Sequence, residues 1–117
     1  MTREFVMMPE FDRQWFKQGL TDDDLRQLQE VLLKNPKAGK IIRGTKGLRK
    51  LCIAFEGKGK SGGGRVVYVD FAVHESIYFI TVYPKSEKDS LSKAERNSIA
   101  KMIDRLEQGL KDVSARK

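Results

Sequence analysis

The sequence predicts an α+β fold in which a small, mainly antiparallel sheet packs against helices. Three observations support this. Three apolar runs of strand length lie between residues 48 and 83, two segments before them have apolar residues at helical spacing, and one such segment follows them. The predicted order of elements is β-α-α-β-β-β-α. At 117 residues the chain has the length of a single domain, and we expect its core to span about residues 5–110.

The first two elements are predicted from a short apolar run and the proline that follows it. Residues 5–8 form the run, which indicates a first strand, and Pro9 suits the first turn of a helix. Phe11 and Trp15 are four residues apart, so they share one face of this helix and are expected in the core. Gly19 is expected to end the helix.

A second helix is predicted to begin after Thr21, a good N-cap residue. The acidic residues 22–24 follow it in the first turn, where the helix dipole favours negative charge. An apolar stripe continues the helical spacing: Leu25, Leu28 and Leu32. Asn35-Pro36 ends the helix, and residues 36–47 are expected to be a basic, glycine-containing connection.

The three apolar runs in the middle of the chain are predicted to be consecutive strands. In residues 48–55, Leu51 and Ile53 fall on one face while Lys50 and Cys52 fall on the other. Residues 65–71 and 77–83 are the next two strands, joined by a short polar turn around His74-Glu75-Ser76. The run 77–83 is apolar on both faces, which is typical of a central strand, and Pro84 ends it.

The last element is predicted to be a helix that starts with a capping box. Ser92 and Glu95 have the S-x-x-E spacing of that motif. The apolar stripe of the helix is Ile99, Met102, Ile103, Leu106 and Leu110. The tail beyond Gly109 is expected to be frayed.

The sequence predicts neither a metal site nor a cofactor. Cys52, the only cysteine, lies in an apolar run and is expected to be a buried thiol. His74, the only histidine, lies among polar neighbours that could not complete a metal site with it. No apolar run approaches the ~20 residues that a membrane span needs, and the first residues lack the apolar block of a secretory signal. We therefore expect a cytoplasmic protein with no membrane partner.

The positive charge of the chain is concentrated in residues 40–65. This segment holds eight Lys and Arg residues against one Glu, which equals the net charge of +7 of the whole chain. Residues 57–65 alone contain five glycines with Lys58, Lys60 and Arg65. Glycines let the backbone approach a ligand closely, and these cations suit phosphate oxygens. The alternative is a solvated hairpin tip. A nucleotide-binding loop is disfavoured because a strand, not a helix, follows the glycines.

Two strings of residues carry a family resemblance. The first runs from Gly47-Leu-Arg-Lys-Leu51 through Gly57-Lys-Gly-Lys60 to Arg65-Val-Val-Tyr68, and the second is Tyr78 to Tyr83-x-Lys-x-Glu87-Lys with Leu91-Ser92. Over about residues 5–106 the chain resembles the RelE/ParE superfamily of bacterial toxins, in particular the HigB-type branch of RelE-like toxins. The predicted order of elements is the order of that family.

The resemblance implies a cytoplasmic toxin of a type II toxin–antitoxin system. RelE- and HigB-type members are ribosome-dependent mRNA endonucleases (mRNA interferases) that inhibit translation and need no metal. Their partners are the ribosome with its mRNA and a cognate antitoxin, usually a small helix-turn-helix DNA-binding protein. Operator DNA would be reached only through the antitoxin.

Matching the family's motifs to this sequence gives a candidate catalytic set: Lys58, Lys60, Arg65, Tyr83 and Lys85. Further cations are expected to grip the RNA backbone: Arg43, Lys46, Arg49 and Lys50. The chain departs from the branch at Ser61 and Gly64, where a basic and a small residue are common, which puts the number of phosphate contacts in question. Crowding of cations lowers the pKa of a lysine, so Lys58 and Lys60 are candidate bases.

Two alternatives from other classes remain open. The ParE side of the superfamily has the same fold but inhibits DNA gyrase without catalysis, and it lacks the full set of cations. A basic nucleic-acid-binding module without chemistry is the second alternative. Such a module would bind RNA with a steep salt dependence and release no cleaved product.

Overall fold

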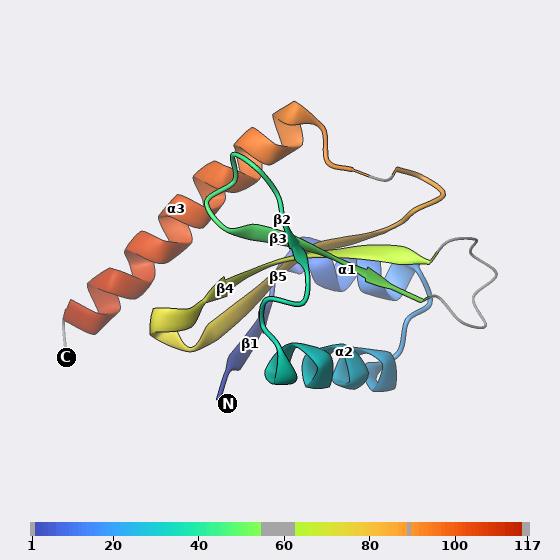
Figure 1. Cartoon of the computed structure of the whole chain (residues 1–117), viewed down its shortest axis with the longest axis horizontal. Helices are drawn as coiled ribbons and strands as arrows, with labels where there is room; N and C mark the ends of the chain where they lie inside the picture. Colours follow the sequence, from blue (N-terminus) through green and yellow to red (C-terminus); the bar gives the residue numbers. More distant parts are fainter. Residues whose placement is uncertain (1, 55–62, 89, 116–117) are drawn as a thin grey trace.

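The structure, a computed structural model, describes residues 2–54, 63–88 and 90–115 (Figure 1). In this part of the chain the helices are α1 (Pro9–Lys17), α2 (Asp22–Lys34) and α3 (Lys93–Ala115), with a 3-10 turn, η1 (Ala72–His74). The strands are β1 (Glu4–Met7), β2 (Lys40–Ile41), β3 (Leu48–Ile53), β4 (Gly64–Phe71) and β5 (Ser76–Pro84). The predicted α+β fold and element order are confirmed, with β2 as an addition.

The strands form one mixed sheet in the order β1-β5-β4-β3-β2. β1 is parallel to β5, and the other neighbours are antiparallel. β2 was not predicted because it has two residues, Lys40 and Ile41, inside the segment expected to be a connection. It exists only by pairing with Lys50 and Arg49 of β3, and such pairing leaves no local pattern in the sequence.

One face of the sheet is covered by α1 and α2. Phe11 stacks on Trp15 and on Phe79 of β5, with ring centroids 5.2 and 4.9 Å apart. The buried residues of this layer are Phe11, Trp15, Leu20, Leu28, Leu32, Val66, Tyr68, Ile77, Phe79 and Val82. Thr21 caps α2 through a reciprocal hydrogen-bond pair with Asp24, as its position predicted. The expected core positions of both helices are confirmed.

The other face packs against α3, and we call it the α3 face. Figure 1 shows α3 running along the sheet as a layer separate from α1 and α2. Its buried core residues are Leu48, Val67, Val69, Phe71, Ile80, Tyr83, Leu91 and Ile103. Ser92 and Glu95 form the predicted capping box. α3 continues past Gly109 to Ala115, and Leu110 still packs against the core.

A buried tyrosine fixes the connection that leads into β2. The Tyr68 hydroxyl donates to the Pro36 carbonyl at 2.8 Å and accepts from the Gly39 N–H at 2.9 Å. Arg49 Nη1 donates to the Gly39 carbonyl at 2.9 Å. A Cβ on Gly39 would lie 2.9 Å from the Tyr68 ring, so only glycine fits this close approach. Burial raises the pKa of Tyr68 above its ordinary value, which keeps the hydroxyl protonated as a donor.

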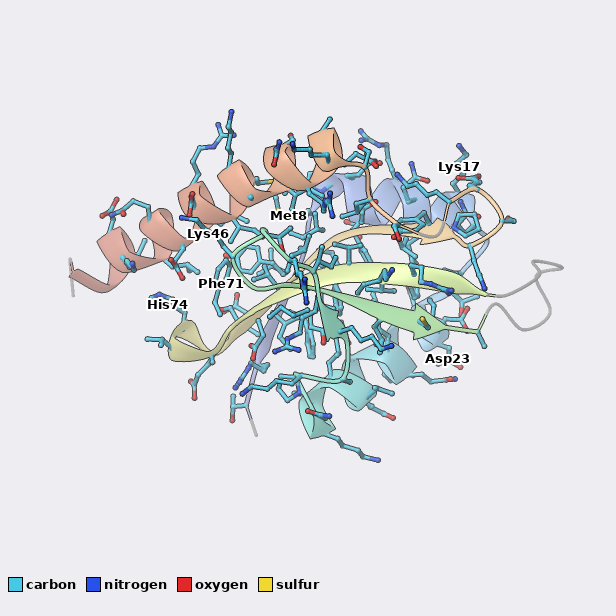
Figure 2. The ribbon with its side chains drawn as sticks, turned by 45° about the horizontal axis from the view of Figure 1, so that its top comes forward. Met8, Lys17, Asp23, Lys46, Phe71 and His74 are labelled. Atoms are coloured by element: carbon cyan, nitrogen blue, oxygen red, sulfur yellow. The ribbon has the colours of Figure 1, made fainter. Side chains whose placement is uncertain are left out.

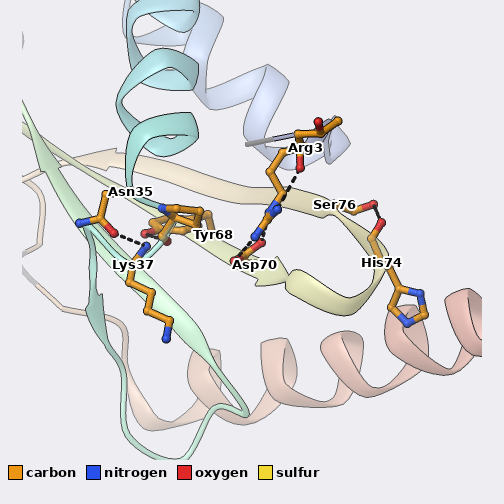
Figure 3. Close-up of polar contacts among 9 residues, drawn as sticks. Arg3, Asn35, Lys37, Tyr68, Asp70, His74 and Ser76 are labelled. Atoms are coloured by element: carbon orange, nitrogen blue, oxygen red, sulfur yellow. Dashed lines mark hydrogen bonds and ion pairs between the residues drawn. The ribbon is translucent and has the colours of Figure 1, made fainter.

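A partly buried ion pair ties the N-terminus to β4 (Figure 3). Arg3 Nε and Nη2 lie 2.8 and 3.3 Å from the two carboxylate oxygens of Asp70. The hydrogen bond to Asp70 raises the pKa of Arg3. Because the pair spans from the residue before β1 to the centre of the sheet, it holds the edge strand in register with β5.

No helix in the described ranges is long and apolar enough to cross a membrane.

Candidate functional site

Arg65 and Tyr83 form the centre of the site. They lie directly opposite each other on β4 and β5, and Cys52 of β3 lies opposite Arg65 on its other side. Residues opposite each other in an antiparallel ladder point to the same face, so all three belong to the α3 face. Arg65 is 7% exposed and Tyr83 is 4% exposed. A nearly buried arginine beside a nearly buried tyrosine is a closely packed arrangement, in which the Arg65 guanidinium donates a buried hydrogen bond to the Gly64 carbonyl.

The expectation that Cys52 is buried was wrong, because its thiol is exposed. β2 pairs with Arg49 and Lys50 of β3 but does not reach Cys52, two residues further along the strand. The apolar run predicted a buried position. At Cys52, however, β2 has ended, so β3 is the edge strand of the sheet there. Cys52 therefore borders the site rather than the core.

Glycine is required where the chain enters β4 beside Arg65. Gly63 has a φ of +67°, and a Cβ there would lie 2.1 Å from the Ile53 carbonyl oxygen. The next residue, Gly64, is paired with Ile53 and Pro84, and its carbonyl accepts a hydrogen bond from Arg65 Nη1 at 3.1 Å. This close packing of backbone brings β3, β4 and β5 together at the end of the sheet where Arg65 lies.

The backbone also brings Lys85 to this end of the sheet. Its N–H donates to the Gly63 carbonyl at 3.0 Å, and its side chain is exposed. Lys58 and Lys60 lie outside the described residues, and the described chain breaks off at Ala54 and resumes at Gly63. Of the five candidate catalytic residues, the structure therefore brings Arg65 and Tyr83 together, with the backbone of Lys85 beside them.

Lys88 is a residue of the site that the sequence did not single out. Its ammonium group lies 5.0 Å from the centroid of the Tyr83 ring and 2.5 Å from a carboxylate oxygen of Glu95. The hydrogen bond from Lys88 lowers the pKa of Glu95 below its ordinary value. Since Glu95 also caps α3 through Ser92, it connects the start of that helix to the cation over Tyr83. The capping box was visible in the sequence, but the contact with Lys88 was not.

A pocket of about 710 Å³ borders Tyr83 between α1, β5 and the first half of α3. Lys88 and Glu95 lie on one side of it, and Glu10 and Arg13 of α1 lie on the other. The hydrogen bond from Arg13 lowers the pKa of Glu10, so the ion pair persists at neutral pH. The volume falls within the range of small-molecule sites.

The structure separates the four cations expected to bind an RNA backbone. Lys50 lies on the α3 face, opposite Val67 and diagonal to Arg65. Arg49 faces the α1–α2 side, where it pairs with Tyr68 across the ladder. Lys46 Nζ lies 3.0 Å from Asp104 Oδ1 of α3, and Arg43 is exposed in the loop between β2 and β3.

Lys46 and His74 lie together at the end of the sheet opposite the site. Both line a small pocket with Phe71, at the far end of the β4–β5 ladder (Figure 2). Arg65 lies at the start of β4, the opposite end from Phe71, so neither Lys46 nor His74 shares its surroundings. Within residues 2–54, 63–88 and 90–115, no group of three or more His, Cys, Asp or Glu residues could hold a metal ion.

Comparisons with known proteins agree with the fold. A family model described as the RelE toxin of the RelE/RelB toxin–antitoxin system matches residues 7–114. Among solved structures, an arginine double mutant of the E. coli toxin RelE in the free state superposes with a TM-score of 0.56 at 21% identity, covering 90% of this chain and 98% of that one. The intact E. coli RelBE toxin–antitoxin complex gives a TM-score of 0.53 at 20% identity, with coverages of 72% and 96%. At these identities the structural likeness concerns the fold.

Proposed function

The chain belongs to the RelE toxin family, and we propose that it is the toxin of a type II pair that inhibits translation by cutting mRNA on the ribosome. One observation carries the proposal: Arg65, nearly buried, stands directly opposite Tyr83 at the end of the sheet reached by the backbone of Lys85. The lysine-rich segment with Lys58 and Lys60 connects to β4 beside this pair.

The reaction that suits these groups is attack by the RNA's own 2′-hydroxyl. The 2′-oxygen bonds to phosphorus, the bond to the 5′-oxygen breaks, and the products are a 2′,3′-cyclic phosphate and a 5′-hydroxyl. A base takes the proton of the 2′-hydroxyl, and an acid gives a proton to the leaving 5′-oxygen. Charge on the pentavalent phosphorane must be stabilised between these steps.

Arg65 is our assignment for stabilising the phosphorane. Arginine remains protonated and can bind two phosphate oxygens through its fork. The strand pairs on both sides hold its backbone in place, so little reorganisation is needed when charge develops. Lys58 and Lys60 are assigned as bases or additional cations, and Lys85 as the acid.

Tyr83 is assigned to orient the 2′-hydroxyl rather than to stack on a base, and its buried hydroxyl must be uncovered for this when RNA binds. Tyr83 is only 4% exposed, and Lys88 already lies over its ring. A base stacking on this ring would have to displace Lys88 from its ion pair with Glu95. The neighbouring pocket instead gives a base a place at the edge of the ring.

We assign the ribosome the task of positioning the substrate. The described site has one nearly buried cation and several exposed ones, which would bind free RNA loosely. Correct positioning of reacting groups is worth as much as ~7–11 kcal/mol of a barrier, so a scaffold that presents mRNA in one geometry compensates for a loose site.

The partner proposed for this toxin is a cognate antitoxin. The first protein to test for binding is the small protein encoded beside it. The E. coli RelE structures in the comparison include complexes with the RelB antitoxin. Three further points are predictions from the resemblance. They are a helix-turn-helix antitoxin that carries the pair to operator DNA, a cytoplasmic location, and membership of the HigB-type branch.

The test compares mRNA in a translating extract with the same mRNA free of ribosomes. We expect the purified protein to cut at ribosome-occupied codons and to leave naked RNA almost intact, with the Arg65→Ala variant as the inactive control. Equal cutting of both RNAs would refute the ribosome dependence. Growth inhibition with DNA breaks and intact mRNA would favour a ParE-like gyrase inhibitor instead. RNA binding with no cleaved product and no growth inhibition would favour a module without catalysis.

A further inference from the structure

The connection between β5 and α3 turns back over Tyr83. Directly after the strand, the N–H groups of Glu87 and Lys88 donate to the Pro84 carbonyl at 3.1 and 3.4 Å, which makes a tight turn. The turn brings the Lys88 ammonium group to 5.0 Å from the centroid of the Tyr83 ring, within the range of a cation–π contact. Lys88 therefore covers one face of the ring that lies opposite Arg65 in the ladder.

Glu95 of α3 holds Lys88 in this position. One carboxylate oxygen of Glu95 lies 2.5 Å from Lys88 Nζ, and the other accepts the Ser92 N–H at 2.9 Å. The Glu95 N–H in turn donates to the Ser92 hydroxyl at 3.1 Å. Because this capping box fixes the carboxylate at the start of a helix of 23 residues, Glu95 is a well-anchored partner for Lys88.

Lys88 lies within electrostatic reach of carboxylates on two helices. Glu10 of α1 borders the same pocket as Lys88, and its pKa is lowered mainly by the hydrogen bond from Arg13 and to a smaller extent by the charge of Lys88. Glu10 forms its own ion pair with Arg13 and accepts a hydrogen bond from Gln14. The direct bond to Lys88 comes from Glu95, so Glu95 is the group that sets the position of the ammonium.

A carboxylate at this place works against the binding of RNA. The negative charge of Glu95 repels phosphate, and its ion pair engages the charge of Lys88. A surface that served only to attract RNA would gain nothing from the pair. The order of the Tyr83 ring does gain from it, because the ring lies between its packing in the α3 face and a cation that Glu95 keeps in place.

We propose that Glu95 is a positioning residue of the cleavage site, which acts through Lys88 to keep the Tyr83 ring in the orientation that its hydroxyl needs to meet the 2′-hydroxyl of the RNA. The proposal rests on the proposed function, because it takes Tyr83 as the group that orients the 2′-hydroxyl. Neither Glu95 nor Lys88 contacts the substrate in this assignment. The capping box of α3 thereby has a second task, since it couples the start of the helix to the site.

The experiment follows single-turnover cleavage of ribosome-bound mRNA over a range of toxin concentrations, which separates the maximal rate from the half-saturating concentration. We expect Glu95→Gln to lower the maximal rate about 10–10²-fold, because misplacing a reacting group by about 1 Å can cost about 10²-fold. The half-saturating concentration should stay the same or fall, since the variant removes a negative charge. Ser92→Ala is the matched control. It removes the other half of the cap, keeps the contact between Glu95 and Lys88 and should cut at the native rate.

Variants of Lys88 test whether the effect of Glu95 passes through this residue. Lys88→Arg keeps a cation that can pair with Glu95 and lie over the ring, so it should keep most of the rate. Lys88→Met should lose as much of the maximal rate as Glu95→Gln does, and the double variant should lose no more than either single one. Lys88→Met also replaces Glu95→Gln if thermal unfolding shows that Glu95→Gln does not fold.

Proton NMR tests the geometry without any cleavage. An aromatic ring shifts the signals of protons above its face upfield, so the ε-methylene protons of Lys88 should be shifted in the native chain and in Ser92→Ala, and not in Glu95→Gln. A shift that persists in Glu95→Gln would refute the role of Glu95.

Three results of the cleavage assay would also refute it: a native maximal rate in Glu95→Gln, additive losses in the double variant, or a Lys88→Met variant that keeps the rate but needs more toxin, because Lys88 would then bind RNA. A native chain that cuts no mRNA refutes the proposed function and this role together. A native chain that cuts, with a Glu95→Gln variant that cuts equally well, refutes this role alone.

Discussion

Arg65 and Tyr83 are register partners on adjacent antiparallel strands, and both side chains are nearly buried on the same face of the sheet. Their relative position is therefore set by the hydrogen-bonded ladder rather than by loop conformation. Sites supported on strands hold their groups more accurately than sites on loops. In this protein the ladder fixes one cation and one phenol, while the remaining candidate groups come from the connections at its end.

The first prediction concerns the fork of Arg65. Arg65→Lys keeps the charge but loses the two-pronged contact with phosphate, so we expect cleavage of ribosome-bound mRNA to fall about 10²–10³-fold, as for loss of one group that stabilises charge in the transition state. Growth inhibition on induced expression should be lost with it. Calorimetric titration with the antitoxin should show little change, and a fully toxic lysine variant would remove Arg65 from the site.

The second prediction separates the hydroxyl of Tyr83 from its ring. Tyr83→Phe keeps the buried ring beneath Lys88, so the fold should be retained. We expect the cleavage rate to fall about 10²-fold or more, the lower end of what a positioned proton-handling group contributes, while the affinity for a short single-stranded RNA with 2′-O-methylated riboses, which cannot be cut, remains the same. Full activity of the phenylalanine variant would show that the ring alone is used. Tyr78→Phe, on the same strand, is the matched control.

The third prediction is a pH dependence at Glu95. Its pKa lies below the ordinary value of 4.5 because Lys88 and the cap of α3 stabilise the carboxylate. This stabilisation is complete above pH 4.5 and is lost as the pH falls through the lowered pKa. Glu95→Gln should therefore reduce the free energy of unfolding above pH 4.5 by about 0.5–1 kcal/mol, a modest value because the Lys88 and Glu95 side chains are 37% and 41% exposed.

Urea denaturation at several pH values checks this result. The difference between the native chain and Glu95→Gln should shrink steadily as the pH is lowered below 4.5. Glu107→Gln serves as the control, because Glu107 pairs with Lys111 on α3 at 3.7 Å but caps no helix; its effect should stay below about 0.5 kcal/mol. A difference that stays constant down to low pH would contradict the assigned role of the Glu95 carboxylate.

The fourth prediction tests how the connection before β2 is held. Tyr68→Phe leaves the Gly39 N–H and the Pro36 carbonyl without the hydroxyl that bonds both. Because these groups are buried, the free energy of unfolding should fall by about 1–3 kcal/mol. Hydrogen exchange should increase at Gly39 and at Lys40. Unchanged exchange there, with the same loss of stability, would mean that the connection is held by Arg49 alone.

Local patterns account for the parts of the fold that were predicted correctly. Thr21 caps α2 and Ser92 with Glu95 caps α3, and both motifs depend on hydrogen bonds within four residues. The alternation in β3 correctly put Lys50 and Cys52 on one face. Patterns of this range cannot show β2, which depends on a strand eight or more residues away, nor the exposure of Cys52, which depends on where that strand stops.

The candidate site was predictable in its chemistry and only partly in its geometry. The sequence showed that the cations concentrate in residues 40–65. Yet period-two alternation within β3 separates Arg49 from Lys50, and the sequence does not indicate which of them faces Arg65. Lys88 was not singled out because its partner Tyr83 comes from another element.

By itself the amino-acid sequence determined the helices, the strands other than β2 and the sign of the charge, because these follow from apolar spacing, capping residues and composition. The tertiary structure alone decided which face of the sheet α3 covers, and hence which cations meet at Arg65. The physical reason is that side-chain alternation specifies two faces but does not distinguish them. Burial of the apolar stripe of α3 against Leu48, Val67 and Phe71 makes that choice.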